Sequence, residues 1–496
     1  AAYAGIAAAG KEVFFFAPGA EASRGVLEAE GFTGATTVAK LLRDTSLQER
    51  LRGQVIWVDE AGTLGARDMA KLFDVAEAAR ARVILSGDVH QHAPVARGDA
   101  LRVLESEAGL RPAELTTVYR QTRTAYREAV EAISRGDERG AREGFERLEA
   151  MGAVREVEDE SRYTELAGAY LETVLGEGKS ALVVSPTHAE GAEVTEAIRQ
   201  GLRQAGQLGD AERAFTRLKS LGLTEAERGD ARSYTHGLVV QSHGHIKGLK
   251  PGTPYAVAEV DEDAVWLAAG ELSPHAPRIP LPLCEAAKFE VLDRDTVRLA
   301  AGDLIRITRN GMAKSRTASG RRQELRNGAQ YEVEGFTPAG DLKCVGRDTR
   351  GRITSRVVVD RAFGNLTHGY CVTSHAAQGK TVDRVFVAQS AAAFRANTRE
   401  QFYVSVSRGR ESIAVFTDDR EALRSQISRS AARMSASEFA RARERERSQE
   451  LQRHARSASR LIEEARAFAR RRAAQIMALI ASPRRERTYH GPQRGV

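Results

Sequence analysis

The stretch VIWVDEAG at residues 55–62 follows four apolar residues with two adjacent carboxylates, Asp59 and Glu60. Because side chains alternate along a β-strand, the two acids are expected to point in opposite directions. One acid can then hold Mg²⁺ through a water molecule while the other acts as general base toward a second water. This is the chemistry of a nucleotide-hydrolysing enzyme. The structural alternative is an acidic pair at a strand end that pairs with nearby arginines.

The segments around this stretch predict a parallel sheet. Three strands and one helix are predicted at residues 12–18, 54–60, 82–88 and 67–81. Strands that alternate with helices of this length indicate a parallel sheet covered on both faces. Binding residues in such sheets gather at the carboxyl ends of the strands, which here carry Pro18, Asp59–Glu60 and Gly87–Asp88.

A second α/β region follows, with segments at residues 181–187, 189–206, 368–389 and 412–418. Between its halves, short strand-like pieces separated by Gly, Pro, Asn and Asp predict a small antiparallel barrel at about 235–360. Residues 199–234 are predicted to form a charged helical linker or insert. The fold class is therefore α/β, with two parallel-sheet domains. Its predicted divisions are 1–150, 151–234, 235–360, 361–420 and 421–496.

The last division differs in charge from the rest of the chain. Residues 421–496 contain 18 Arg and 8 Glu without Lys or Asp, a net charge of +10 that leaves −3 for the other 420 residues. The segment is predicted to be helical, with residues 482–496 unstructured. A basic tail on a near-neutral body suggests a polyanionic partner, although such tails can also be plain solvated helices.

The overall composition excludes several classes of protein. Hydrophobic residues make up 42% and charged residues 28% of the 496 residues, as in ordinary globular proteins. No apolar run is long enough to cross a bilayer, so no membrane insertion is expected. Three scattered cysteines, Cys284, Cys344 and Cys371, argue against a disulfide framework or a zinc site and favour a reducing, cytoplasmic location.

A glutamine follows the third predicted strand, in the segment GDVHQHAPV at residues 87–95. The Gln91 amide could hydrogen-bond both a γ-phosphate and an attacking water without acting as a base itself. The alternative is a loop glutamine that makes turn contacts. His90 and His92 are separated by a single residue and have no cysteine nearby, so no metal site is predicted there.

Three arginines could stabilise the charge that develops on a transferred phosphoryl group. Arg120 stands in VYRQ, and Arg408 and Arg410 stand in YVSVSRGRE at residues 403–411. Each could instead form a surface salt bridge. Arg408 belongs to the second predicted α/β domain, so it would reach a nucleotide on the first domain only when the domains close.

Together these blocks resemble, in order and spacing, the motifs of superfamily one DNA helicases of the RecD-like branch. Within that branch the sequence is most similar to the helicase part of TraI/TrwC-type (MobF) conjugative relaxases, partly because His92 replaces the leucine of most RecD-like proteins. The matching blocks are APGAEASRGVL, VIWVDEAG, GDVHQHAPV, VYRQ, VVSPT, VTSHAAQGKTVDRVFV and YVSVSRGRE.

The resemblance implies two RecA-like domains, a barrel inserted in the second, ATP and Mg²⁺ as cofactors, and 5′-to-3′ movement on single-stranded DNA. It implies that Asp59 holds the magnesium and Glu60 is the general base. Gln91 would be the γ-phosphate sensor, and Arg120 and Arg408 the arginine fingers. Further nucleotide contacts are assigned to Gly379 and Arg410. DNA contacts are assigned to Pro18, Thr36, Lys40, Thr187, Thr373, His375 and Gln378, with Lys380 as a weaker candidate.

Such an enzyme also needs a phosphate loop, G-x-x-x-x-G-K-[ST], after a strand and opening a helix. The runs ending in Gly178-Lys179-Ser180 and Gly379-Lys380-Thr381 carry Thr173 and Ser374 where the first glycine belongs. In the family the loop opens the helix that the first ten residues here would complete. We therefore expect a fragment that begins just after the loop, rather than a complete protein that has lost ATP hydrolysis.

Two departures from the family keep alternatives open. The relaxase half, with its tyrosine nucleophile and metal-binding histidines, does not occur in this sequence, so nicking is not predicted. Aromatic residues make up only 6% of the chain, which identifies no stacking platform for bases. The leading hypothesis is the ATP-dependent helicase part of a conjugative relaxase, with single-stranded DNA and conjugation proteins as partners. The alternatives are a hydrolysis-dead DNA-binding scaffold and a stand-alone RecD-like helicase or exonuclease subunit.

Overall fold

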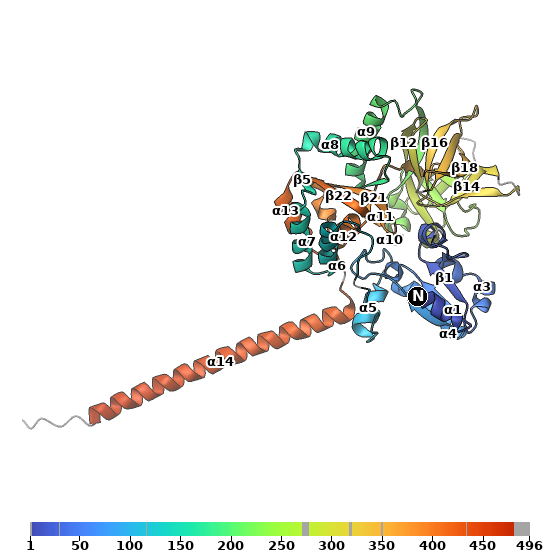
Figure 1. Cartoon of the computed structure of the whole chain (residues 1–496). Coiled ribbons are helices and arrows are strands. Elements are labelled where there is room, and N and C mark those ends of the chain that lie inside the picture. The colour runs from blue at the N-terminus through green and yellow to red at the C-terminus, as the bar shows by residue number, and fades with distance from the viewer. Residues whose placement is uncertain are drawn as a thin grey trace, which may run out of the picture. The chain divides into compact units, whose positions relative to one another are not determined.

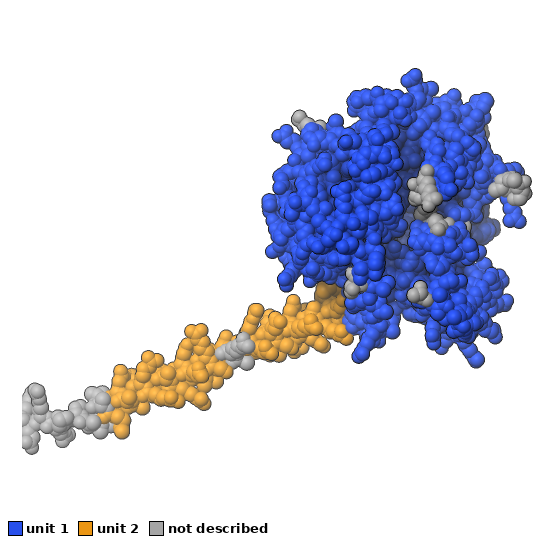
Figure 2. Space-filling model, in the orientation of Figure 1, with its two compact units in different colours: residues 1–431 blue, residues 432–496 orange. Residues whose placement is uncertain are grey.

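The computed structural model describes residues 2–28, 30–115, 117–269, 277–316, 320–348, 351–432 and 434–480. The chain divides into two compact units, residues 1–431 and residues 432–496, which Figure 2 shows in different colours. The two units are described separately. The predicted unstructured ending at 482–496 lies outside the described residues.

The first parallel sheet carries the two acids at its centre. Its order is β2-β1-β3-β4, with every pair parallel. Apolar residues of alternate register face opposite sides, so Ile56 and Val58 pack against Leu72 of α4, whereas Phe15 packs with Leu27 on the other face. The strands are β1 (Val13–Ala17), β2 (Thr36–Thr37), β3 (Val55–Val58) and β4 (Arg82–Leu85). The helices are α1 (Ala2–Ala8), a π-helical turn (Glu21–Leu27), α2 (Val38–Leu41), α3 (Thr45–Arg50), α4 (Ala66–Ala78) and α5 (Ala100–Glu107).

The second parallel sheet has the order β20-β6-β21-β22-β5 and is covered on both faces (Figure 1). Val385 and Val387 of β21 pack toward α6, α7 and α12, whereas Phe386 packs toward α8 and α9. Helices α6 and α7 fall within the predicted first division, yet they cover this second sheet. The strands are β5 (Val154–Glu156), β6 (Ala181–Val184), β20 (Cys371–Val372), β21 (Val382–Gln389) and β22 (Gly409–Thr417). The helices are α6 (Thr124–Ser134), α7 (Glu138–Ala150), α8 (Asp159–Leu171), α9 (His188–Gln204), α11 (Ser374–Ala377), α12 (Arg399–Val406) and α13 (Arg420–Gln426).

Antiparallel strands lie between the two halves of the second sheet, as predicted. They form a six-stranded sheet β11-β10-β9-β8-β12-β7, a five-stranded sheet β18-β17-β16-β13-β19 and the hairpin β14-β15. Both large sheets have two edge strands in the described residues, so a closed barrel is not confirmed. The strands are β7 (Arg213–Ser220), β8 (Val239–Ser242), β9 (Pro254–Val260), β10 (Val265–Ala269), β11 (Ile279–Pro280), β12 (Phe289–Leu299), β13 (Leu304–Ile307), β14 (Gly311–Arg316), β15 (Arg322–Leu325), β16 (Gln330–Phe336), β17 (Leu342–Arg347), β18 (Ile353–Val359) and β19 (Leu366–His368), with the short helix α10 (Glu225–Arg228).

The helical prediction for residues 199–234 is wrong over β7. Phe215 and Leu218 are three residues apart, a spacing that fits one face of a helix. In the structure they point to opposite faces of a strand and join different apolar clusters. The spacing of apolar residues suggests a helix here because both faces of this strand are covered, so buried residues do not alternate with exposed ones.

The second unit contains the predicted helical tail. Helix α14 (Ala436–Ile480) is 45 residues long and rich in arginine. Several of its large apolar side chains are exposed, including Leu461 and Phe468. None of the helices in the described part of the chain is long and apolar enough to cross a membrane.

Candidate functional site

The two acids lie in the turn directly after β3 and have different partners. Asp59 accepts a hydrogen bond from the Ser86 hydroxyl at 2.7 Å, at the end of the neighbouring strand β4. Glu60 has a left-handed backbone, with φ of 52°, which directs the chain away from the strand. Its Oε2 accepts a hydrogen bond of 3.0 Å from the side-chain amide of Gln378. Asp59 therefore has its partner in the first sheet, whereas Glu60 has its partner in a segment of the second α/β region.

The environment of Glu60 favours a proton-accepting role. Burial raises the pKa of Glu60, and the neighbouring charge of Asp59 raises it further. The hydrogen bond from Gln378 and the charge of Arg408 act in the opposite direction. A carboxylate whose pKa is raised by burial is a better base than an exposed one, and this is how enzymes adapt acids for proton transfer.

Asp88 links the predicted sensor Gln91 to the second α/β region. Its Oδ2 accepts hydrogen bonds from Gln91 Nε2 at 3.3 Å and from the Tyr403 hydroxyl of α12 at 2.9 Å. The Oε1 atom of Gln91 is buried without a hydrogen-bond partner. Because buried polar atoms normally have partners, this free acceptor fits a water or ligand donor in the site.

Arg408 is only 2% exposed at the end of α12. Its guanidinium donates to the Val404 carbonyl and to the Ser407 hydroxyl, each at 2.7 Å. Burial, then the like charge of Arg120, lowers the pKa of Arg408 to about 10. Arg120 donates to the Ser407 carbonyl at 2.8 Å, which brings both predicted arginine fingers to one corner of the second region. Neither forms a salt bridge among the described residues.

Arg410 differs from these two arginines. Its side chain is 47% exposed and forms an ion pair of 2.7 Å with Asp383, at the start of β21. This is the salt bridge considered as the alternative for each arginine. Gly379, the other assigned nucleotide contact, has a φ of +77° in the turn after α11, a conformation that favours glycine.

Two histidines connect the loop after β4 to helix α11. The rings of His92 and His375 stack with centroids 3.6 Å apart and an angle of 11° between planes. His92 Nε2 also hydrogen-bonds the Ser374 hydroxyl at 2.9 Å. Burial lowers the pKa of His92 to about 3, so its ring is neutral at physiological pH. Across the described residues, no three His, Cys, Asp or Glu side chains form a metal-binding group.

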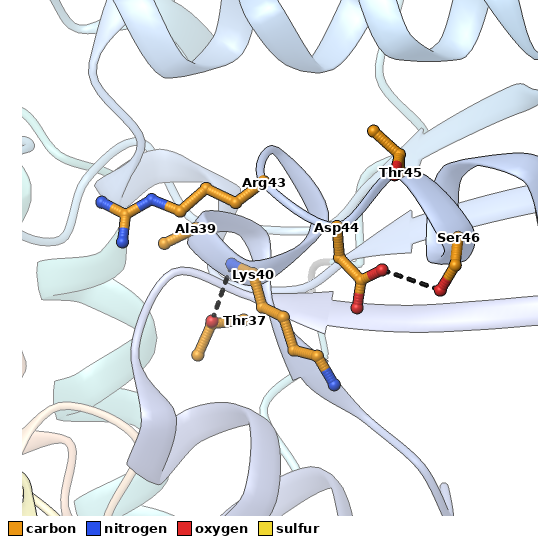
Figure 3. Close-up of a pocket in the computed structure, with 7 residues that line it drawn as sticks. All are labelled: Thr37, Ala39, Lys40, Arg43, Asp44, Thr45 and Ser46. Carbon is orange, nitrogen blue, oxygen red and sulfur yellow. Dashed lines mark hydrogen bonds between the residues drawn. The ribbon is translucent and has the colours of Figure 1, made fainter.

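The predicted DNA contacts fall into two sets. Pro18 follows β1, Thr36 lies in the edge strand β2, and Lys40 lies in α2. Lys40 lines an open cavity of about 570 Å³ with Thr37 and Arg43. Figure 3 shows the charged ends of Lys40 and Arg43 pointing in different directions. The Thr36 hydroxyl is buried without a partner.

The other set belongs to the second α/β region. Thr187 caps α9 by accepting a hydrogen bond from the Glu190 backbone, and Thr373 occupies the N-terminal cap position of α11. His375 stacks on His92. The side-chain amide of Gln378, a predicted DNA contact, donates a hydrogen bond to Glu60. Lys380 is 3.4 Å from the Gln330 side chain of β16.

Sequence reasoning missed two residues of this site. Ser86 directly precedes the block GDVHQHAPV and Tyr403 opens the block YVSVSRGRE, but neither has a motif signal of its own. Ser86 and Tyr403 bind the carboxylates of Asp59 and Asp88.

The site residues fit ATP and magnesium on several grounds. Mg²⁺ usually keeps several waters and takes one or two carboxylates together with substrate phosphates, which Asp59 can satisfy. Gln91 Oε1 has no hydrogen-bond partner, so a ligand or water can supply a donor to it. Arg408 is a buried cation without a salt bridge, so a phosphate can supply the negative charge that it lacks.

Two parts of the chain match known protein families. Residues 1–159 match the family described as AAA domain, and residues 368–415 match the UvrD-like helicase C-terminal domain. The chain is 25% identical over 441 residues to conjugal transfer protein TraA of Agrobacterium fabrum, covering 87% of this chain and 30% of that protein. It is 20% identical over 448 residues to the multifunctional conjugation protein TraI of Escherichia coli K12, covering 82% and 24%. The chain thus spans less than a third of these relatives.

Solved structures with some likeness include Pif1 helicase from Bacteroides in complex with ADP-AlF3 and single-stranded DNA. That match has 14% identity and a TM-score of 0.37, and it covers 88% of each chain. The two matched families support a helicase-type chain, in agreement with the resemblance of its motifs to RecD-like helicases. The chain is also similar in sequence to the conjugation proteins TraA and TraI.

Proposed function

We propose that this chain is the ATP-hydrolysing helicase region of a conjugation protein and moves along single-stranded DNA. The observation that carries the proposal is the hydrogen bond between Glu60 and Gln378. It joins the proposed general base to the TSHAAQGKT segment, for which the family resemblance implies DNA contacts. A change in that segment can therefore alter the base directly.

The roles of the residues follow from their environments. Glu60, with its raised pKa, accepts a proton from the attacking water, and Gln91 orients that water through its free Oε1. Arg120 and Arg408 stabilise negative charge that develops on the phosphoryl group. Asp59 would hold Mg²⁺ through water, and the bound ion would neutralise phosphate charge.

DNA binding is assigned to residues for which the family resemblance implies DNA contacts. Pro18, Thr36 and Lys40 would contact DNA from the first α/β region, and Thr187, Thr373 and His375 would contact it from the second. Direction of travel from 5′ to 3′, conjugation partners and a cytoplasmic location are parts of the same proposal, since they rest on the resemblance to larger proteins.

The test is Glu60→Gln in the full-length product of the gene. Replacing a general base should reduce ATP hydrolysis stimulated by single-stranded DNA by roughly 10²–10⁴-fold, while nucleotide affinity stays within a few-fold. Turnover close to that of the wild type would remove Glu60 from the proposed role.

A DNA-binding scaffold without hydrolysis is the second candidate, favoured by the charge of +10 on residues 421–496. Full-length protein that binds oligonucleotides with a steep salt dependence but hydrolyses no ATP would select this candidate.

A further inference from the structure

Tyr403 is a buried tyrosine of α12 to which the proposed hydrolysis assigns no role. Its side chain is 8% exposed and belongs to the apolar core of the second α/β region. Its hydroxyl donates a hydrogen bond of 2.9 Å to Asp88 Oδ2, in the loop after β4 of the first region. A phenylalanine would pack in the same core without needing a polar partner, so packing alone does not account for the hydroxyl.

Asp88 holds the loop that carries the proposed sensor Gln91. Its Oδ1 accepts a hydrogen bond of 2.9 Å from the backbone N–H of His90, which fixes the turn. Its Oδ2 accepts hydrogen bonds from the Tyr403 hydroxyl and from Gln91 Nε2. A single carboxylate oxygen thus joins α12 to the sensor.

This carboxylate also decides the orientation of the Gln91 amide. A carboxylate only accepts hydrogen bonds, so it binds the Nε2 end of an amide and not the Oε1 end. The Oε1 atom is the one that is buried without a partner. Since an amide nitrogen has two N–H groups, Nε2 can donate the second one to a phosphate oxygen while Oε1 accepts from the attacking water.

The loop also touches the second α/β region on both sides of Gln91. His90 lies against the turn between α6 and α7, where a Cβ on Gly136 would meet His90 Nδ1 at 1.9 Å. His92 stacks on His375 of α11. These two contacts keep the loop in place, so removing the Tyr403 hydroxyl should loosen Asp88 without separating the two regions.

Tyr370 shows the same bond in a purely structural setting. It is 4% exposed, and its hydroxyl donates to Asp303 Oδ1 at 3.0 Å. Asp303 is held independently of the tyrosine by its bidentate pair with Arg199. Asp88 lacks such an ion pair among the described residues, so hydrogen bonds alone orient it.

We propose that Tyr403 is a positioning residue for ATP hydrolysis: its hydroxyl holds Asp88, and Asp88 holds Gln91 in the orientation that the attacking water needs. Tyr403 lies five residues before Arg408, so the segment that supplies a proposed arginine finger also sets the sensor. The inference rests on the proposed function and adds to it a residue that acts through another side chain.

The test compares Tyr403→Phe with Tyr370→Phe in the full-length product of the gene. Each variant loses one buried hydroxyl that is bound to a carboxylate. The midpoint of urea unfolding should fall at least as much in Tyr370→Phe, which also loses a hydrogen bond from the Leu304 backbone. The functional readouts are kcat and KM for ATP with saturating single-stranded DNA, and the affinity for the fluorescent nucleotide mant-ADP with and without aluminium fluoride. The fluoride complex imitates the phosphoryl group during transfer.

Tyr403→Phe should lower kcat about tenfold and leave KM for ATP within about twofold, because the misplaced Gln91 matters only to the reacting groups. Affinity for mant-ADP with aluminium fluoride should fall about tenfold, whereas affinity for mant-ADP alone should stay within about twofold. Tyr370→Phe should change none of these quantities beyond about twofold.

A double variant tests the route through Gln91. If Tyr403 acts through Gln91, Tyr403→Phe should add less than about twofold to the loss of fluoride-complex affinity in Gln91→Ala. The inference is overturned by an equal tenfold loss with and without Gln91, by wild-type kcat in Tyr403→Phe, or by the same kcat loss in Tyr370→Phe. Each of these results leaves the motor proposal intact. A wild-type protein that hydrolyses no ATP would overturn both.

Discussion

Replacing Arg408 with methionine separates a catalytic arginine from a structural one. The pKa of Arg408 falls from 12.5 to about 10 on folding. At about 1.36 kcal/mol per unit, this shift means that burying the cation costs the folded state about 3 kcal/mol. The group is protonated in both folded and unfolded chains below pH 10, so the cost applies across the physiological range.

Methionine removes this cost and also removes two hydrogen bonds, to the Val404 carbonyl and the Ser407 hydroxyl. Hydrogen bonds to a charged donor contribute about 1.5 kcal/mol each, or about 3 kcal/mol together. The two effects nearly cancel, so Arg408→Met should change stability by less than about 1 kcal/mol. ATP hydrolysis, by contrast, should fall by about 10³-fold or more if the arginine stabilises transferred charge.

The measurement is the midpoint of urea unfolding by circular dichroism at 222 nm, with DNA-stimulated ATP turnover of the full-length protein as the second readout. Arg199→Met is the matched comparison, because it leaves the fully buried Asp303 unpaired and should cost about 3–5 kcal/mol. If Arg408→Met destabilises the chain as much as Arg199→Met, the reasoning about an unpaired cation is wrong. If it leaves turnover unchanged, Arg408 is no arginine finger.

Two other predictions concern neighbouring residues. Because the pKa of His92 is lowered to about 3 from an ordinary 6.5, the unfolded chain takes up this proton first, and stability should fall as pH drops below about 6.5, by up to about 1.4 kcal/mol per pH unit. The free energy of unfolding is measured by urea titration from pH 7 to pH 4. It should fall less steeply with decreasing pH in His92→Phe than in the wild type, and an identical pH dependence in the two proteins would contradict this prediction. Arg410→Gln should lower ATP turnover less than tenfold, since Arg410 pairs with Asp383 at the surface. A loss equal to that of Arg408→Met would restore Arg410 as a nucleotide contact.

Several elements could be predicted from sequence because local pattern decides them. The strands predicted at residues 54–60 and 82–88 have apolar runs bounded by turn residues, and the observed β3 and β4 lie within them. The helical tail was predicted from composition in the same way. Strand β7 was missed because its two buried residues serve opposite faces at a helix-like spacing.

Contacts between distant segments could not be predicted. The partner of Glu60 stands 318 residues away, and no local pattern reports that Gln378 reaches a carboxylate rather than DNA. Arg408 and Arg410 look equivalent in sequence, yet one is buried without a counter-charge and the other pairs with Asp383. Packing decides these roles, and packing depends on the whole fold.

We propose that single-stranded DNA acts on ATP hydrolysis through Gln378, because this side chain hydrogen-bonds Glu60. The most direct measurement is the ratio of ATP turnover with and without saturating single-stranded DNA, for wild-type full-length protein and for Gln378→Met. Loss of one hydrogen bond to the charged Glu60 should reduce the stimulation by about tenfold, while unstimulated turnover and oligonucleotide affinity change by less than about threefold. Equal stimulation in the two proteins, or a loss explained wholly by weaker DNA binding, would contradict the account.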